Sequence, residues 1–127
     1  MATIEKGRKL MTLVNVFTVS PKKQAALVDL LVRATEETMR HLPGFISASI
    51  HRSLDGTKVI NYAQWRSDAD FAALQKDSRA RAHMQAAAEI ASFEPTICEV
   101  VDSIGSASPQ RQDDSRSAQD PSSLKWS

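Results

Sequence analysis

Hydrogen-bonding side chains interrupt an apolar face on two predicted strands of this chain. Read with the two-residue period of a strand, residues 59–65 (VINYAQW) place Asn61 and Trp65 on one side, among apolar neighbours. Asn15 interrupts an earlier strand in the same way. Buried amides and indole N–H groups need hydrogen-bond partners. These groups therefore either satisfy one another and the backbone, or line a cavity that holds a ligand with matching polar atoms.

The composition is that of a single globular domain, and it argues against several classes of partner. The chain has 127 residues, of which 42% are hydrophobic and 24% are charged. Its net charge of +1 supplies little attraction for nucleic acid or for anionic membranes. No apolar run approaches the roughly 20 residues that cross a bilayer, and the N-terminal residues do not resemble a secretory signal. We expect a cytoplasmic protein that binds neither nucleic acid nor membrane.

Metal-ligating residues are sparse. Cys98 is the single cysteine, and the three histidines are His41, His51 and His83. No zinc-ligand spacing results, so we predict no metal site, and Cys98 is expected to act as a small buried hydrophobe.

Turn and capping residues divide the first hundred residues into strands and helices. Ser20 and Pro21 can begin a helix, Asp-Gly between two alternating runs predicts a hairpin, and Ser67 can cap a second helical region. The predicted strands are residues 10–19, 45–53, 58–66 and 96–104. The predicted helices are residues 22–42, 67–77 and 78–93.

This order, β-α-β-β-α-β, is that of an α+β ferredoxin-like sandwich, in which both helical regions cover one face of a four-stranded antiparallel sheet. We assign this domain to residues 1–104. Residues 105–127 are rich in Ser, Asp, Gln, Pro and Arg, which predicts a disordered tail.

Strand alternation divides the apolar side chains between the two sheet faces. The face toward the helices is predicted to carry Leu13, Asn15, Phe17, Phe45, Val59, Asn61, Ala63, Trp65, Ile97 and Val101. The uncovered face is predicted to carry Val14, Val16, Ile46, Ala48, Ile50, Ile60, Tyr62 and Val100. Because so apolar a face is unsuited to water, we predict a homodimer that packs sheet against sheet.

Residues 42–74 resemble the antibiotic biosynthesis monooxygenase family of dimeric ferredoxin-like proteins. The resemblance is carried by Pro-Gly-Phe before the second strand, Asp-Gly at the turn and Asn-Tyr-Ala-Gln-Trp on the third strand. The order of elements extends it to about residues 8–104. The chain is most similar to the branch that oxidises polycyclic aromatic polyketides, such as anthrones or hydroquinones, to quinones. That branch uses O₂ and no flavin, haem or metal, so the resemblance implies no cofactor and a small aromatic substrate.

The resemblance also implies roles for the polar residues. Asn61 and Trp65 match pocket residues of that branch, and Asn15 matches an Asn that some relatives use. A reduced polycyclic phenol can pass an electron to O₂ from its anion, so the protein need only exclude water, orient the ring and favour the anion. Donors such as Asn61 and the Trp65 indole N–H can perform the last task, and Asn15 completes the predicted catalytic set.

The predicted substrate-binding residues are mostly apolar. Phe17, Phe45 and Phe71 would form flat walls, while His83, water or the acidity of the substrate itself would account for proton removal. The quinone-forming branch has Tyr and Arg in its pocket helices, where this chain has Phe71 and Met84.

Two alternatives stay open at this point. A haem-degrading monooxygenase would pair Asn15 with an iron-binding His83, although the additional Trp of that branch falls at Leu74. A non-catalytic dimer that binds an aromatic ligand is the other.

Overall fold

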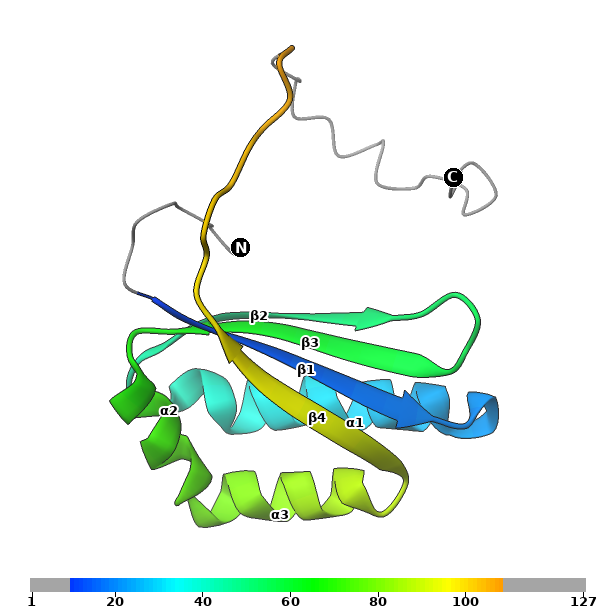
Figure 1. The fold of residues 1–127 in the computed structure, drawn as a ribbon. Helices are drawn as coiled ribbons and strands as arrows, with labels where there is room; N and C mark the ends of the chain where they lie inside the picture. Colours follow the sequence, from blue (N-terminus) through cyan, green and yellow to red (C-terminus); the bar gives the residue numbers. More distant parts are fainter. Residues whose placement is uncertain (1–9, 109–127) are drawn as a thin grey trace.

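A four-stranded antiparallel sheet in the order β2-β3-β1-β4 forms one layer of the molecule, and the helices cover one of its faces (Figure 1). The computed structural model describes residues 10–108. Its strands are β1 (Met11–Val19), β2 (Phe45–Arg52), β3 (Lys58–Trp65) and β4 (Ala91–Cys98). Its helices are α1 (Gln24–Glu37), α2 (Asp68–Gln75) and α3 (Ser78–Ala88), with short 3₁₀ turns at Pro21–Lys23 and Met39–His41. The predicted β-α-β-β-α-β order is confirmed, with the second helical region divided into α2 and α3.

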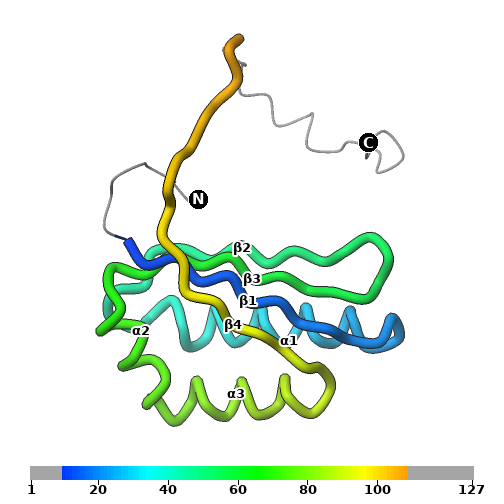
Figure 2. The backbone as a smooth tube through the Cα atoms, viewed as in Figure 1, coloured from blue at the N-terminus to red at the C-terminus, as the bar shows by residue number. Residues whose placement is uncertain are grey.

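The hairpin between β2 and β3 forms where the Asp-Gly pair predicts it, and Figure 2 shows its turn at the right-hand end of the sheet. Oδ1 of Asp55 accepts hydrogen bonds from the Ser53 hydroxyl, at 2.7 Å, and from the amide and hydroxyl of Thr57. The Ser53 hydroxyl, followed by the Thr57 groups, lowers the pKa of Asp55 to about 2. Gly56 follows with φ at +83°, which a residue without Cβ adopts readily. The turn residues therefore fix the register of the two strands.

The predicted helix starts are confirmed in position. Pro21 occupies the first helical position after Ser20, although the Ser20 side chain makes no capping bond. Before α2, the Ser67 hydroxyl accepts a hydrogen bond from the Asp70 amide and donates one to the Asp70 carboxylate. Arg66 also binds this carboxylate, with nitrogen–oxygen distances of 2.8 and 2.9 Å. The Arg66 and Ser67 hydrogen bonds lower the pKa of Asp70 and fix the turn from β3 into α2.

The prediction of the last strand at residues 96–104 is wrong in its bounds. Helix α3 ends at Ala88, and β4 begins at Ala91 and ends at Cys98. Pro95 lies within β4 opposite Asn15, where the sequence suggested a break before the strand. Since β4 is an edge strand, a residue without an N–H is tolerated there.

The predicted division of the sheet faces is wrong for Val100 and Val101, which follow β4 and belong to no strand, and it is also wrong for β2. The register shifts between Phe45 and Ser47, where a bulge adds one residue to β2. Ala48 and Ile50 consequently pair with Ala63 and Asn61, on the face toward the helices. The opposite face instead receives the serines and the histidine of β2, next to an apolar centre on β1 and β3. The apolar centre consists of Val14, Val16, Ile60 and Tyr62.

The core on the helix-covered face consists of two apolar clusters. One contains Phe17, Val19, Leu27, Leu31, Val59 and Ala87. The other contains Met11, Leu13, Ala63, Trp65 and Phe71. Along β1 and β3, Asn15 and Asn61 occupy the positions between the two clusters. The polar residues noted in the sequence thus separate the two halves of the core.

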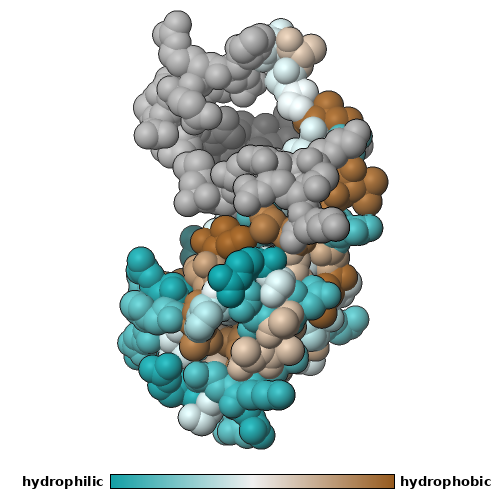
Figure 3. All heavy atoms as spheres, turned by 90° about the vertical axis from the view of Figure 1, so that its left-hand side faces the viewer, coloured by the Kyte–Doolittle hydropathy of each residue, from teal (hydrophilic) through white to brown (hydrophobic). Residues whose placement is uncertain are grey.

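The chain leaves the sheet after β4 and has no helix or strand in residues 99–108 (Figure 1). Val101 and Ile104 are 79% and 86% exposed, and Figure 3 shows hydrophobic surface along this segment. Most of the predicted tail, residues 109–127, lies outside the described residues. Within residues 10–108, no helix is long and apolar enough to span a membrane. The domain boundary and the cytoplasmic location stay predictions.

Gly44 is expected to be intolerant of a side chain. Its φ is +85°, and a Cβ there would collide with the Asp70 side chain. We predict that Gly44→Ala lowers the free energy of unfolding by about 2 kcal/mol, because a left-handed conformation and a clash are combined. Gly105→Ala is the matched control, since nothing lies within 4 Å of a Cβ there. Urea unfolding of both variants checks this; equal midpoints would contradict it.

Candidate active site

A cavity of about 440 Å³ lies between the sheet and the helices. All four strands and all three α-helices contribute to its wall. The cavity is of the size that encloses a small organic ligand, and most of its lining is apolar. It occupies the region where the amide pair separates the two core clusters.

Asn15 and Asn61 lie opposite each other on β1 and β3, and both line the cavity. Asn15 is 5% exposed, and Asn61 is half-buried. The Oδ1 atom of each amide is buried and has no hydrogen-bond partner. The two side chains therefore do not form a hydrogen bond with each other. A purely structural amide pair would be expected to form one. Each Oδ1 atom can accept a hydrogen bond from a ligand hydroxyl, and each side-chain NH₂ group can donate one to a phenolate oxygen.

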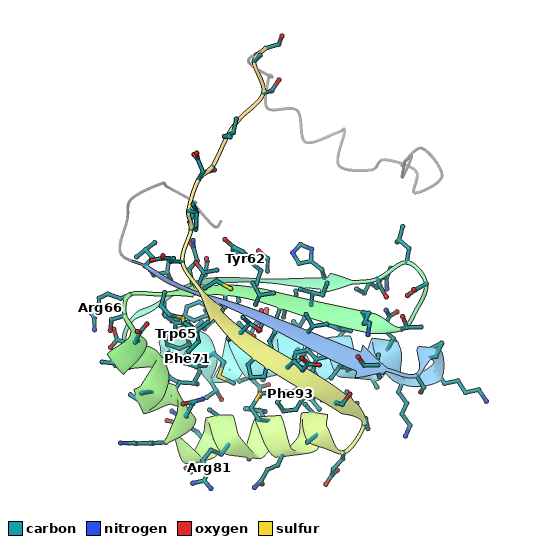
Figure 4. All side chains as sticks on the ribbon, viewed as in Figure 1. Tyr62, Trp65, Arg66, Phe71, Arg81 and Phe93 are labelled. Atoms are coloured by element: carbon teal, nitrogen blue, oxygen red, sulfur yellow. The ribbon has the colours of Figure 1, made fainter. Side chains whose placement is uncertain are left out.

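Three aromatic rings that contact one another form part of the cavity wall. Trp65, which is 2% exposed, packs edge-on against Phe45 at a centroid distance of 5.4 Å and against Phe71 at 6.1 Å. Figure 4 shows Trp65 and Phe71 between the sheet and the helices. These edge-to-face contacts hold the indole in a fixed orientation. All three residues line the cavity, as the sequence predicted from resemblance.

A second aromatic pair forms another part of the wall. Phe17 of β1 and Phe93 of β4 lie 5.1 Å apart, ring centre to ring centre. Both line the cavity, and Figure 4 shows Phe93 on the side of β4 that faces α3. Phe93 was assigned to a helix in the sequence prediction, so its place in the wall was missed. The correct strand bounds, with Phe93 opposite Phe17, would have indicated it.

The helices complete the wall with mixed side chains. Met84 of α3 lines the cavity as predicted, but so do Gln75 at the end of α2 and Arg81 and Gln85 of α3. These polar residues were not among the predicted site residues. Arg81 and Gln85 lie three positions before and one position after Met84, so helical periodicity could have placed all three on neighbouring faces.

His83 does not line the cavity, contrary to the prediction that it binds substrate. Its Nε2 atom lies 3.1 Å from Oγ1 of Thr38, a residue at the end of α1 that is 2% exposed. The imidazole therefore connects α3 to α1 outside the cavity. The residues described do not fit a haem with His83 as its iron ligand, because this imidazole and Asn15 do not share the cavity.

The arrangement suits chemistry on a flat, apolar molecule with a polar edge. Apolar walls exclude water, which strengthens hydrogen bonds from the few polar groups inside. Among the described residues that line the cavity, none has a carboxylate or imidazole side chain. A proton of the ligand would therefore have to pass to water, or the ligand would have to be acidic enough to ionise without a basic side chain.

A protein-family model for antibiotic biosynthesis monooxygenases matches residues 10–89 of the chain. The chain is also 50% identical over 110 residues to the tetracenomycin-F1 monooxygenase of Streptomyces glaucescens, covering 87% of this chain and 98% of that protein. The chain belongs to the antibiotic biosynthesis monooxygenase family. The resemblance inferred from residues 42–74 is thereby confirmed.

Two solved oxygenase structures share the fold. The monooxygenase from the gene ActVA-Orf6 of Streptomyces coelicolor, solved with the ligand nanaomycin D, is 29% identical and has a TM-score of 0.74. The alignment covers 84% of this chain and 100% of that one. SnoaB of Streptomyces nogalater, a cofactor-independent oxygenase, is 20% identical with a TM-score of 0.68, over 77% and 99% of the two chains. At that identity the second likeness concerns the fold.

In this family member, the contact between Thr38 and His83 is expected to stabilise the wall of the cavity. We predict that Thr38→Val and His83→Leu each lower the free energy of unfolding, because each removes one partner of a partly buried hydrogen bond. A double-mutant cycle measured by urea unfolding should give a coupling energy of about 1 kcal/mol. Strict additivity of the two substitutions would show that the hydrogen bond contributes nothing.

Proposed function

We propose that this chain oxidises an electron-rich polycyclic aromatic, such as an anthrone or hydroquinone, to a quinone with O₂ and without a cofactor. The observation that carries the proposal is the unpartnered amide pair inside an apolar cavity walled by aromatic rings. Family membership and the relative named for tetracenomycin F1 support a polycyclic substrate.

The reaction balances without an external reductant when an anthrone is the substrate. The anthrone CH₂ carbon loses a proton to give an anion, which transfers one electron to O₂. The resulting radical and superoxide combine to form a C–O bond, and the peroxide is then protonated. Loss of water cleaves the O–O bond and leaves a carbonyl on that carbon. One oxygen atom enters the product, the other leaves as water, and the substrate supplies all four electrons.

The protein accelerates this sequence through position and hydrogen bonding. In this proposal the side-chain NH₂ groups of Asn15 and Asn61, together with the Trp65 indole N–H, donate to the oxygen on which the anion's charge accumulates. Donors in a water-excluded site can contribute roughly 2.7–4 kcal/mol each to a transition state. The rings of Phe17, Phe45 and Phe71 would hold the substrate flat, and Met84 would complete the wall.

Removal of one donor tests this role. We predict that Asn61→Ala and Trp65→Phe lower kcat for 1,8-dihydroxyanthrone by roughly 10² while the protein stays folded, because each variant removes a placed donor. Absorbance at the quinone band and O₂ uptake measure the rate, and thermal unfolding measures folding.

Tyr62→Phe is the matched control for this test. Tyr62 is adjacent to Asn61, but Figure 4 shows its side chain on the face of β3 that points away from the helices. Its substitution should leave turnover within about twofold. Equal loss of activity at both positions, in proportion to lost folding, would make the strand a core element without chemistry. Ligand binding with no O₂ uptake would identify a non-catalytic binding protein.

We also propose that the protein is a homodimer through the uncovered sheet face. Val14, Val16, Ile60 and Tyr62 form its apolar centre and are each half-buried. Three side-chain oxygens lie in one row across the strands next to it, each buried without a hydrogen-bond partner. They are Thr12 Oγ1, Gln64 Oε1 and Ser47 Oγ. A second copy would bury the apolar centre.

A charge on this face should separate the two copies. We predict that Ile60→Asp converts a dimer near twice the chain mass of 14.0 kDa to a monomer, because an unpaired carboxylate cannot be buried in the interface. Leu54→Asp is the control, since Leu54 is 67% exposed in the hairpin turn. Light scattering on both variants decides the question. A monomeric parent protein would refute the proposal.

A further inference from the structure

Arg81 is the one charged residue among the described residues that line the cavity. It lies in the first half of α3, one turn before Gln85, and both residues are exposed at the rim. The other polar lining residues on the helices are neutral. The cavity therefore has a neutral amide pair at the sheet and a single positive charge at the helical rim.

No hydrogen bond or ion pair occupies the Arg81 guanidinium within residues 10–108. The neighbouring arginines differ in this respect. Arg79 lies 3.6 Å from the Asp77 carboxylate, and Arg66 binds Asp70 through two nitrogens. Figure 4 shows Arg81 extending from α3 into the solvent. Rotation of its long side chain toward the cavity would thus break no hydrogen bond or ion pair among residues 10–108.

We propose that Arg81 recognises a carboxylate on the substrate, on the side of the molecule away from the phenolic or keto oxygen that contacts the amide pair. A guanidinium matches a carboxylate with two parallel hydrogen bonds, and the pair is stronger where apolar walls displace water. A single positive charge beside the neutral side chains of Gln75 and Gln85 suits a monoanion. The inference rests on the proposed function and adds the class of substrate, a polycyclic aromatic acid.

The geometry assigns different tasks to the two ends of such a ligand. The phenolic or keto oxygen would contact the amides of Asn15 and Asn61, while the acid group would lie at the rim near Arg81. Since the carboxylate keeps its charge throughout the oxidation, its contact with Arg81 would contribute equally to substrate and transition state. The contact should consequently affect KM and leave kcat unchanged.

Steady-state oxidation of two matched anthrones tests the assignment. The probes are 1,8-dihydroxyanthrone and its 3-carboxylic acid. We expect Arg81→Gln to raise KM for the acid about tenfold with kcat unchanged, and to change KM for the neutral anthrone by less than twofold. Arg81→Lys should recover part of the loss. An equal change for both anthrones, or none for either, would overturn the proposal.

Arg79→Gln is the matched control, because Arg79 lies on the same helix turn and does not line the cavity. It should leave both KM values within twofold. Thermal unfolding of each variant establishes that the comparison is made between folded proteins. A KM change at Arg79 as large as that at Arg81 would attribute the effect to general surface charge and overturn the proposal.

Binding of the two corresponding quinones, which cannot be oxidised further, separates this inference from the proposed function. Calorimetry should show that the parent protein prefers 1,8-dihydroxyanthraquinone-3-carboxylic acid to 1,8-dihydroxyanthraquinone, and that Arg81→Gln removes the preference. If that holds while neither anthrone is oxidised, Arg81 recognition stands and the proposed oxidation fails. If both anthrones are oxidised and the preference is absent, the oxidation stands and the acid substrate is refuted. If neither anthrone is oxidised and neither quinone binds, both proposals are refuted.

Discussion

The antiparallel pairing of β1 with β3 is the constraint on which the site depends. This pairing joins the two central strands and sets Asn15 opposite Asn61, with apolar pairs before and after them. A slip of β1 by one residue against β3 would turn Asn15 to the other face of the sheet and bring Val14 or Val16 into the cavity wall. The apolar clusters on either side of the amides oppose that slip. The register therefore creates a polar position inside a core that is otherwise apolar.

The surrounding packing makes that position available to a ligand. Phe45 and Phe71 hold Trp65 from two sides, and the bulge in β2 brings Phe45 and Ala48 onto the same face although they are three residues apart. Without the bulge, Phe45 and Ala48 would lie on opposite faces of the sheet, and the Phe45 ring would no longer pack against Trp65. Local irregularity in an edge strand is thus part of what shapes the cavity.

The features that the sequence predicted correctly have short-range causes. Asp55 and Gly56 specify their turn, Ser67 and Asp70 specify the start of α2, and strict alternation places Asn61 and Trp65 together. The errors arise where a tertiary contact decides. Pro95 was taken as a break, but an edge strand accepts it, and this misplaced Phe93. His83 and Arg81 are both polar residues on α3. Only the packing of α3 against α1 determines which of them lines the cavity.

The two edges of the sheet have a further consequence for how copies of the chain can meet. An exposed edge strand invites pairing with the edge of another molecule, which leads to fibrous aggregates. In β4 the proline withholds an N–H from any incoming strand, and in β2 the bulge disrupts the regular spacing of donors and acceptors. Growth of the sheet by addition of strands at either edge is therefore disfavoured.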